Sequence, residues 1–309
     1  TGGKTWVNEG TLTVGGDDYI FFGYSSGGAN VLSNASTGTL NLSSSYATPL
    51  NFYTGTATVN NAGILNQTAG GAHAIDTTFN NTGTVNVNAG TLTLSGGGTD
   101  TGVYAVGTGA TLNFSGGTRD LNAGSNVSGL GSLAVSGATV NVNNLLDIST
   151  SGTALNVSSG TLNANSTLTV GALNLSGGTL AGAGNLTTTG PFNITGISAI
   201  TGGGVLTTRG ATKIDMGTSN GYLQFTGGKT WVNEGTLTVG GDDYIFFGYS
   251  SGGANVLSNA STGTLNLSST NAVPLNFYTG TATVNNAGTL NQTATGTHTV
   301  DTTFNNTGT

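Results

Sequence analysis

Residues 1–84 of the chain return as residues 226–309 with eight differences and no insertion or deletion. Residues 1–44 and 226–269 are identical letter for letter. A solenoid of stacked units uses such copies, because each unit buries its open end against the next unit. The repeat therefore predicts one long tandem unit at residues 1–225 and the start of a second at residues 226–309, in one solenoid without a linker.

A shorter phrase recurs within the long unit and indicates strands. Gly or another small residue precedes alternating apolar and polar residues, as in GTLTV (10–14), GTLTL (90–94), ATLNF (110–114) and GSLAV (131–135). Alternation over four to six residues is the pattern of a half-buried strand. We expect the leucines of successive phrases, such as Leu92, Leu112 and Leu133, to point into one shared core.

Helix is disfavoured because Gly interrupts the chain every few residues, at roughly 1 kcal/mol for each position in a helix interior. Charged residues make up only 6% of the chain, so the polar outer faces rich in Lys and Glu that a sandwich needs are missing. We therefore expect an all-β parallel β-solenoid with almost no α-helix, and the phrase spacing indicates about 20 residues per coil.

Asparagine recurs at a like position in the phrase. Like residues of stacked coils lie one above another, so these amides are expected to form ladders along the stack. The asparagines concerned are Asn41, Asn86, Asn113, Asn141, Asn156 and Asn174.

Composition excludes several classes of function. The chain has a net charge of −7 with five Lys and Arg residues in total, which is too few for a nucleic-acid-binding face. No apolar run approaches the roughly 18 residues of a transmembrane segment. There is no cysteine, and a long solenoid core needs no disulfides.

Residues 79–137 and 171–196, with their GTL-apolar-Ser-Gly-Gly phrasing, resemble the repeats of secreted bacterial adhesins of the filamentous-haemagglutinin type. The phrasing is also similar to the strand repeats of autotransporter passenger domains. The resemblance implies a right-handed parallel β-helix, export across an outer membrane, and a role in adhesion, aggregation or biofilm. It carries no catalytic residue onto this chain.

The densest carboxylate pair is Asp17–Asp18, which returns as Asp242–Asp243. Paired carboxylate oxygens are ligands that Ca²⁺ accepts, so these four residues are candidate metal ligands. A polar turn before a strand is the competing interpretation, because the nonapeptide calcium repeat is not present. No other cofactor is expected.

Aromatic residues follow the carboxylates at once, in the segments YIFFGY (19–24) and YIFFGY (244–249). An exposed aromatic surface that occurs once in each long repeat is expected to be a contact patch for a neighbouring fibre or a glycan. The alternative is that the rings fill a wide coil. The residues proposed for the patch are Tyr19, Phe22, Tyr24, Tyr244, Phe247 and Tyr249.

His73 and Asp76, repeated as His298 and Asp301, are the candidate acid–base pair. No nucleophile or second acid lies near them in sequence, and we interpret the segment as a solvated loop. The basic residues Arg119, Arg209 and Lys213 are too dispersed for the groove of a polysaccharide lyase. We therefore expect no enzymatic activity.

These features predict a structural and adhesive segment of a secreted bacterial surface filament or giant adhesin. Its partners would be further copies of the same solenoid, end to end and laterally, and glycans or a cell surface, with no nucleic acid and no membrane span. The alternative is an extracellular matrix fibre made of short subunits that dock end to end. Ice binding through Thr-x-Thr pairs is a lesser alternative, because Thr-x-Asn phrases interrupt those pairs.

Overall fold

The computed structural model describes residues 1–149 and 152–309. Within these residues the chain forms β-strands and turns, and no α-helix is present. The strands stack in parallel as a β-solenoid with about 14 turns of roughly 22 residues each. The predicted all-β parallel β-solenoid is confirmed.

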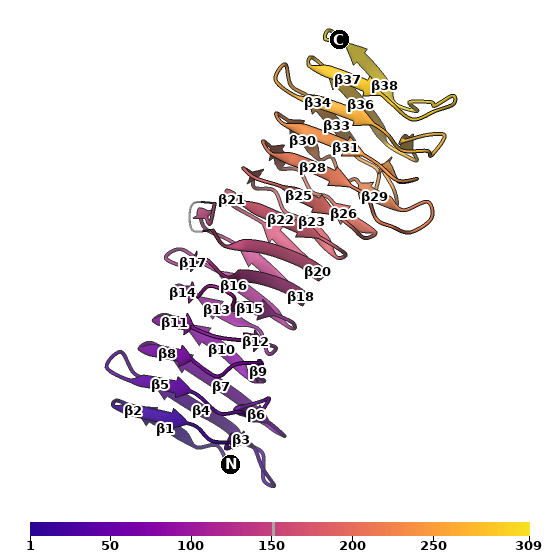
Figure 1. Ribbon diagram of the computed structural model, residues 1–309. Coiled ribbons are helices and arrows are strands. Elements are labelled where there is room, and N and C mark those ends of the chain that lie inside the picture. Colours follow the sequence, from indigo (N-terminus) through magenta and orange to yellow (C-terminus); the bar gives the residue numbers. More distant parts are fainter. Residues whose placement is uncertain (150–151) are drawn as a thin grey trace. The chain divides into compact units, whose positions relative to one another are not determined.

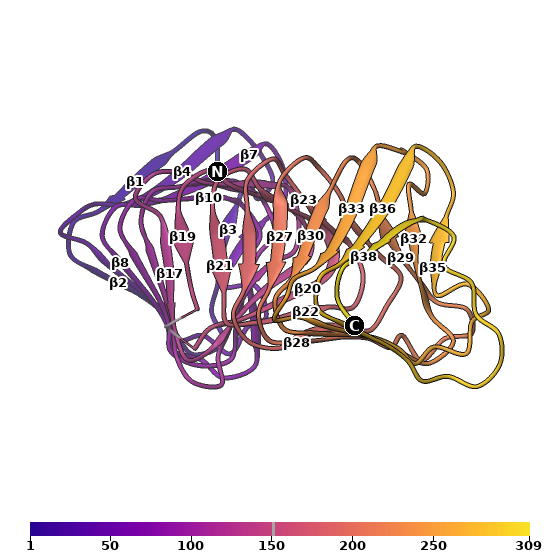
Figure 2. The ribbon, with the colours of Figure 1, turned by 90° about the horizontal axis from the view of Figure 1, so that it is seen from above.

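The chain forms two compact units, residues 1–154 and 155–309. In both units a full coil contributes one strand to each of three parallel ladders, and the stacked strands of single ladders are visible in Figures 1 and 2. The repeat boundary at 225/226 falls inside the second unit, between two consecutive strands, β29 (Tyr222–Phe225) and β30 (Thr230–Asn233).

The first unit contains three ladders and one further short strand. Its first ladder consists of β1 (Thr5–Asn8), β4 (Ala29–Asn34), β7 (Thr56–Asn61), β10 (Thr78–Asn81), β13 (Gly98–Asp100), β16 (Thr118–Leu121) and the second half of β18 (Ser132–Val142). Its second ladder consists of β2 (Thr11–Val14), β5 (Thr39–Leu42), β8 (Ile64–Gln67), β11 (Thr84–Val87), β14 (Val103–Val106) and β17 (Asn126–Gly129). Its third ladder consists of β3 (Ile20–Phe22), β6 (Leu50–Phe52), β9 (Ala72–Ile75), β12 (Thr91–Leu94), β15 (Thr111–Phe114) and the first half of β18, and β19 (Leu146–Asp147) follows.

The second unit repeats this arrangement. One ladder consists of β21 (Leu168–Val170), β24 (Leu186–Thr188), β27 (Val205–Thr208), β30, β33 (Ala254–Asn259), β36 (Thr281–Asn286) and β38 (Thr303–Asn306). Another consists of β22 (Ala172–Leu175), β25 (Phe192–Ile194), β28 (Ala211–Ile214), β31 (Thr236–Val239), β34 (Thr264–Leu267) and β37 (Thr289–Gln292). The last consists of β20 (Ala154–Ala164), β23 (Thr179–Ala181), β26 (Ser198–Ile200), β29, β32 (Tyr244–Phe247) and β35 (Leu275–Phe277).

The core consists of apolar rows that run along the stack. Leu92 pairs with Leu112 and Leu112 pairs with Leu133, and all three side chains are buried. The predicted shared core is confirmed. Alternation along each strand places the intervening Thr and Asn side chains outside.

Coil length varies more than the phrase spacing indicates. The step along the chain from Leu162 to its partner Leu180 is much shorter than the step from Ile20 to its partner Leu50. The longer coil contains a turn at residues 23–28, in which Gly23 and Ser25 adopt positive φ angles of 77° and 64°. Such turns lengthen a coil without changing the strand register that the core requires.

Asparagine ladders occur on both sides of the coil wall. On the outside, Asn86 donates to Asn66 and Asn66 donates to Asn41, so the later coil donates to the earlier one. A second, buried ladder was not foreseen. In it, the Nδ2 of the earlier coil donates to the Oδ1 of the later coil. The ladder runs through Asn8, Asn34, Asn61 and Asn81 in the first unit and through Asn233, Asn259, Asn286 and the exposed Asn306 in the second.

Candidate functional site

An exposed group of aromatic rings covers one corner of the first unit, and we call it the aromatic platform. Tyr19 stacks on Tyr46 with ring centroids 4.3 Å apart, and Phe21 lies 5.4 Å from Tyr24 and 5.5 Å from Tyr53. Phe21 is half-buried and the four tyrosines are exposed. Ring separations of this size are those of offset and edge-to-face aromatic pairs.

The platform recurs in the second copy of the repeat. Phe246 is 5.1 Å from Tyr249 and 5.5 Å from Tyr278, and Tyr222 of the preceding coil lies 5.7 Å from Tyr244. Asn271 stands where the first copy has a tyrosine at position 46. Both copies therefore contain five clustered rings, of which one occupies a different sequence position in each copy. In the second copy Tyr278 is exposed and the other four rings are half-buried.

The predicted contact patch is wrong at two residues. Phe22 and Phe247 are buried, because their strands turn these side chains into the core, and each pairs in register with a phenylalanine of the next coil. Neighbouring strand residues face opposite sides. The preceding ring of the same segment, Phe21 or Phe246, therefore occupies the outer surface.

Three further tyrosine positions belong to the platform and were missed from the sequence: Tyr46, Tyr53 with its copy Tyr278, and Tyr222. They lie on coils that neighbour those of their contact partners, far from them in sequence. The number of residues per coil could have identified them. The pairing of Ile20 with Leu50 brings residues 46–53 beside residues 19–24.

The acidic pair of the second copy holds a loop of the preceding coil. Asp243 is buried, and its Oδ2 accepts a hydrogen bond from the backbone N–H of Met216 at 2.6 Å. Asp242 accepts one from the N–H of Asn220 at 2.9 Å. The two carboxylates thus bind opposite ends of the loop at residues 216–220. In the first copy Asp17 and Asp18 are both exposed.

Burial raises the pKa of Asp243, and the negative charges of Asp242 and Asp215 raise it further, while the hydrogen bonds from Met216 and Gly221 oppose that shift. In the part of the chain that the structure describes, no three or more His, Cys, Asp or Glu side chains are grouped to hold a metal ion. This geometry favours the turn interpretation of the acidic pair over a calcium site.

A buried ionic network lies in the core of the first unit and was not foreseen. Arg119 donates to Asp100 at 2.8 Å, and also to the carbonyl oxygens of Phe79 and Gly97. Tyr104 donates its hydroxyl to Asp100 at 2.8 Å. Burial raises the pKa of Asp100, and Arg119 opposes that shift. The network is completely enclosed, so its polar groups pair with one another inside the core and none of them is offered to a substrate.

The predicted solvated loop at the His73 segment is wrong for the histidine itself. His73 is buried within strand β9, and its ring nitrogens lie 2.9 Å from the carbonyl oxygen of Tyr46 and 2.7 Å from that of Gly70. Asp76 lies on the outer surface and accepts a short hydrogen bond from Ser95. Both nitrogens of the ring thus contact backbone carbonyls, which favours a structural role.

Comparison with protein-family models, with curated proteins and with solved structures finds no match for this chain. Among the described residues, no helix is long and apolar enough to cross a membrane. The aromatic platform, which has five clustered rings in each copy of the repeat, is the candidate functional site.

Proposed function

We propose that this chain is a structural and adhesive segment of a secreted bacterial surface filament, in which the aromatic platform forms the periodic lateral contact with a neighbouring copy. The observation that carries the proposal is the recurrence of five clustered rings in both copies of the repeat, in a chain rich in Thr, Ser, Asn and Gly. Contiguous exposed apolar surface of this kind marks interaction sites.

The outer tyrosines supply most of the exposed area of the platform. Tyr24 and Tyr53 are 60% and 64% exposed, and Tyr278 is 59% exposed. Tyrosine provides a large contact area with few rotatable bonds and keeps a hydroxyl for hydrogen bonding, so it loses little entropy when a partner covers it. Lateral contact between two platforms would remove this area from water.

The backbone suits a mechanical role. Within each unit, hydrogen bonds join one coil to the next along three ladders, and the apolar rows and buried amides continue between them. Each coil contacts only its neighbours, as in other solenoids, so the stack resists extension without a separate scaffold. We place the segment outside the cell, on the bacterial surface.

The test replaces Tyr24, Tyr53, Tyr249 and Tyr278 by Ser in the intact chain. We expect an unchanged circular-dichroism spectrum and a marked loss of lateral association, measured by sedimentation velocity and by electron microscopy of bundles. Leu130→Ser with Leu145→Ser is the matched control, because these leucines are similarly exposed and lie outside the platform. Bundling that survives the tyrosine changes would contradict the proposal.

A further inference from the structure

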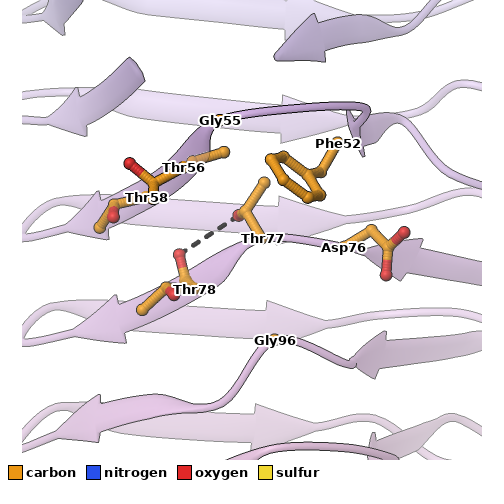
Figure 3. Close-up of a pocket in the computed structure, with 9 residues that line it drawn as sticks. Phe52, Gly55, Thr56, Thr58, Asp76, Thr77, Thr78 and Gly96 are labelled. Atoms are coloured by element: carbon orange, nitrogen blue, oxygen red, sulfur yellow. Dashed lines mark hydrogen bonds between the residues drawn. The ribbon is translucent and has the colours of Figure 1, made fainter. Parts of the chain in front are cut away.

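A shallow hollow on the outer wall occurs once in each copy of the repeat, separate from the rings of the aromatic platform. In the first copy it has a volume of about 270 Å³ and in the second about 330 Å³. Figure 3 shows the first hollow, with the ring of Phe52 lying over Thr77 and three further threonines beside it. Those threonines are Thr56, Thr58 and Thr78.

The hollow arises where a row of core side chains becomes smaller from coil to coil. Phe22 pairs with Phe52, and Leu50 pairs with Ile75, so continuing this register by two positions places Thr77 beside Phe52. The next position in the row is Gly96, whose backbone lies against the carbonyl group of Thr77. The row thus changes from Phe to Thr to Gly, and the ring of Phe52 remains half-exposed above the gap.

The second copy contains the phenylalanine and threonine of this row. Phe247 pairs with Phe277, and Leu275 pairs with Val300, which places Thr302 beside Phe277 in the same way. The hydroxyl of Thr302 is buried and has no hydrogen-bond partner within the described structure. The Phe, Gly, Ala, Asp and Thr positions that line this second hollow are identical to those of the first. Val300, which also lines it, stands where the first copy has Ile75, and residues 70, 72 and 74 nearby differ as well.

We infer that each hollow binds a single neutral sugar ring. The half-exposed phenylalanine offers an aromatic face for the C–H groups of a pyranose, and the threonine hydroxyls and the carboxylate of Asp76 offer hydrogen-bond partners for its hydroxyl groups. No Lys, Arg or His lines either hollow in the described residues, so an anionic ligand such as phosphate or sulfate would find no countercharge. The volume admits one ring and not an extended chain.

The experiment measures saturation-transfer difference NMR on the intact chain with the methyl glycosides of glucose, galactose, mannose and N-acetylglucosamine. We expect saturation transfer to at least one glycoside. In a variant with Thr77→Phe and Thr302→Phe, the added rings fill the gap, and the signal should be lost. A second variant, Thr56→Trp with Thr281→Trp, blocks the rim of each hollow from exposed positions and should have the same effect. The test therefore stands even if the core does not accept the larger side chains at positions 77 and 302.

The matched control is Tyr53→Ser with Tyr278→Ser, which removes neighbouring exposed rings that do not line the hollow. This control should bind the glycoside as the unmodified chain does. Absence of binding to all four glycosides overturns the inference, and so does binding that persists in a folded variant with filled or blocked hollows. The bundling assay measures contact through the aromatic platform, and the glycoside assay measures binding in the hollows. Each proposal can therefore fail while the other holds.

Discussion

Arg119 forms a 2.8 Å ion pair with Asp100, and both side chains are completely buried. Removal of one partner would leave the other charge in the core without compensation. Breaking such a pair typically destabilises a protein by about 3–5 kcal/mol. We therefore expect Arg119→Met to lower the free energy of unfolding by this amount, as measured by urea unfolding of the intact chain.

The matched control for Arg119→Met is Arg209→Met, because Arg209 forms an ion pair of similar length, 2.9 Å, with Glu234 on the outer surface. Exposed pairs contribute about 0–1 kcal/mol. Equal destabilisation by the two substitutions would show that burial of the Asp100 pair does not determine its energetic importance.

The buried amide ladder should be more sensitive to substitution than the outer one. Asn61 accepts from Asn34 at 2.8 Å and donates to Asn81 at 2.9 Å. Asn61→Ala removes the amide donor of the buried Asn81 Oδ1, whereas the Nδ2 of Asn34 keeps two backbone carbonyl acceptors. One unsatisfied buried group is expected to destabilise by about 1–3 kcal/mol. Its neighbour in sequence is the control: Asn60 accepts from Asn80 on the outside, where water replaces the lost bond, and Asn60→Ala should stay within about 0.5 kcal/mol.

Both asparagine variants are compared by thermal unfolding followed with circular dichroism. A melting temperature that falls equally in the two variants would contradict the distinction between the ladders.

Lys229 makes stability depend on pH in the alkaline range. The residue is 3% exposed, and burial lowers the pKa of its ammonium group from 10.5 to about 8. Between these two values the unfolded chain binds the proton and the folded chain does not, so stability increases as pH rises from about 8 to 10.5. The increase contributed by this residue is at most about 3 kcal/mol.

The measurement is the melting temperature at several pH values for the unmodified chain and for Lys229→Met. The variant should be the more stable at pH 7, and the difference should shrink above pH 8. A constant difference across this range would show that Lys229 keeps its proton in the folded state.

Phe246 and Phe247 are adjacent in sequence and should respond differently to truncation. Phe247 is completely buried, and Phe→Ala at such a site destabilises by about 3–5 kcal/mol. Phe246 is half-buried in the aromatic platform, so Phe246→Ala is expected to cost about 1 kcal/mol while it removes the centre of the contact surface. Urea unfolding gives both values, and the reverse order would refute the placement of the two rings.

The sequence predicted the fold because a solenoid is encoded locally. Alternation identifies the strands, and the recurrence of Leu92, Leu112 and Leu133 gives the step between coils. The same reasoning failed for Phe22, because two adjacent aromatic residues leave the parity of the strand ambiguous, and a shift of one residue exchanges the inner and outer faces.

The buried ion pair was missed for a different reason. Asp100 and Arg119 are 19 positions apart, which looks dispersed when the chain is scanned for local clusters. That distance is close to one coil, so opposite charges at this separation are candidates for direct contact in any solenoid. Tyr104 follows Asp100 by four residues, across the turn at the coil corner. The position of its hydroxyl depends on the geometry of that turn, which the repeat pattern does not predict.

The two kinds of amide ladder run in opposite directions along the stack. In the buried ladder Asn34 donates toward the later coil, whereas in the outer ladder Asn66 donates toward the earlier one. The side-chain dipoles of the two ladders therefore point antiparallel and offset one another, unlike the aligned peptide dipoles of a helix. Coils can therefore be added to such a stack without the side-chain amide dipoles all adding up in one direction.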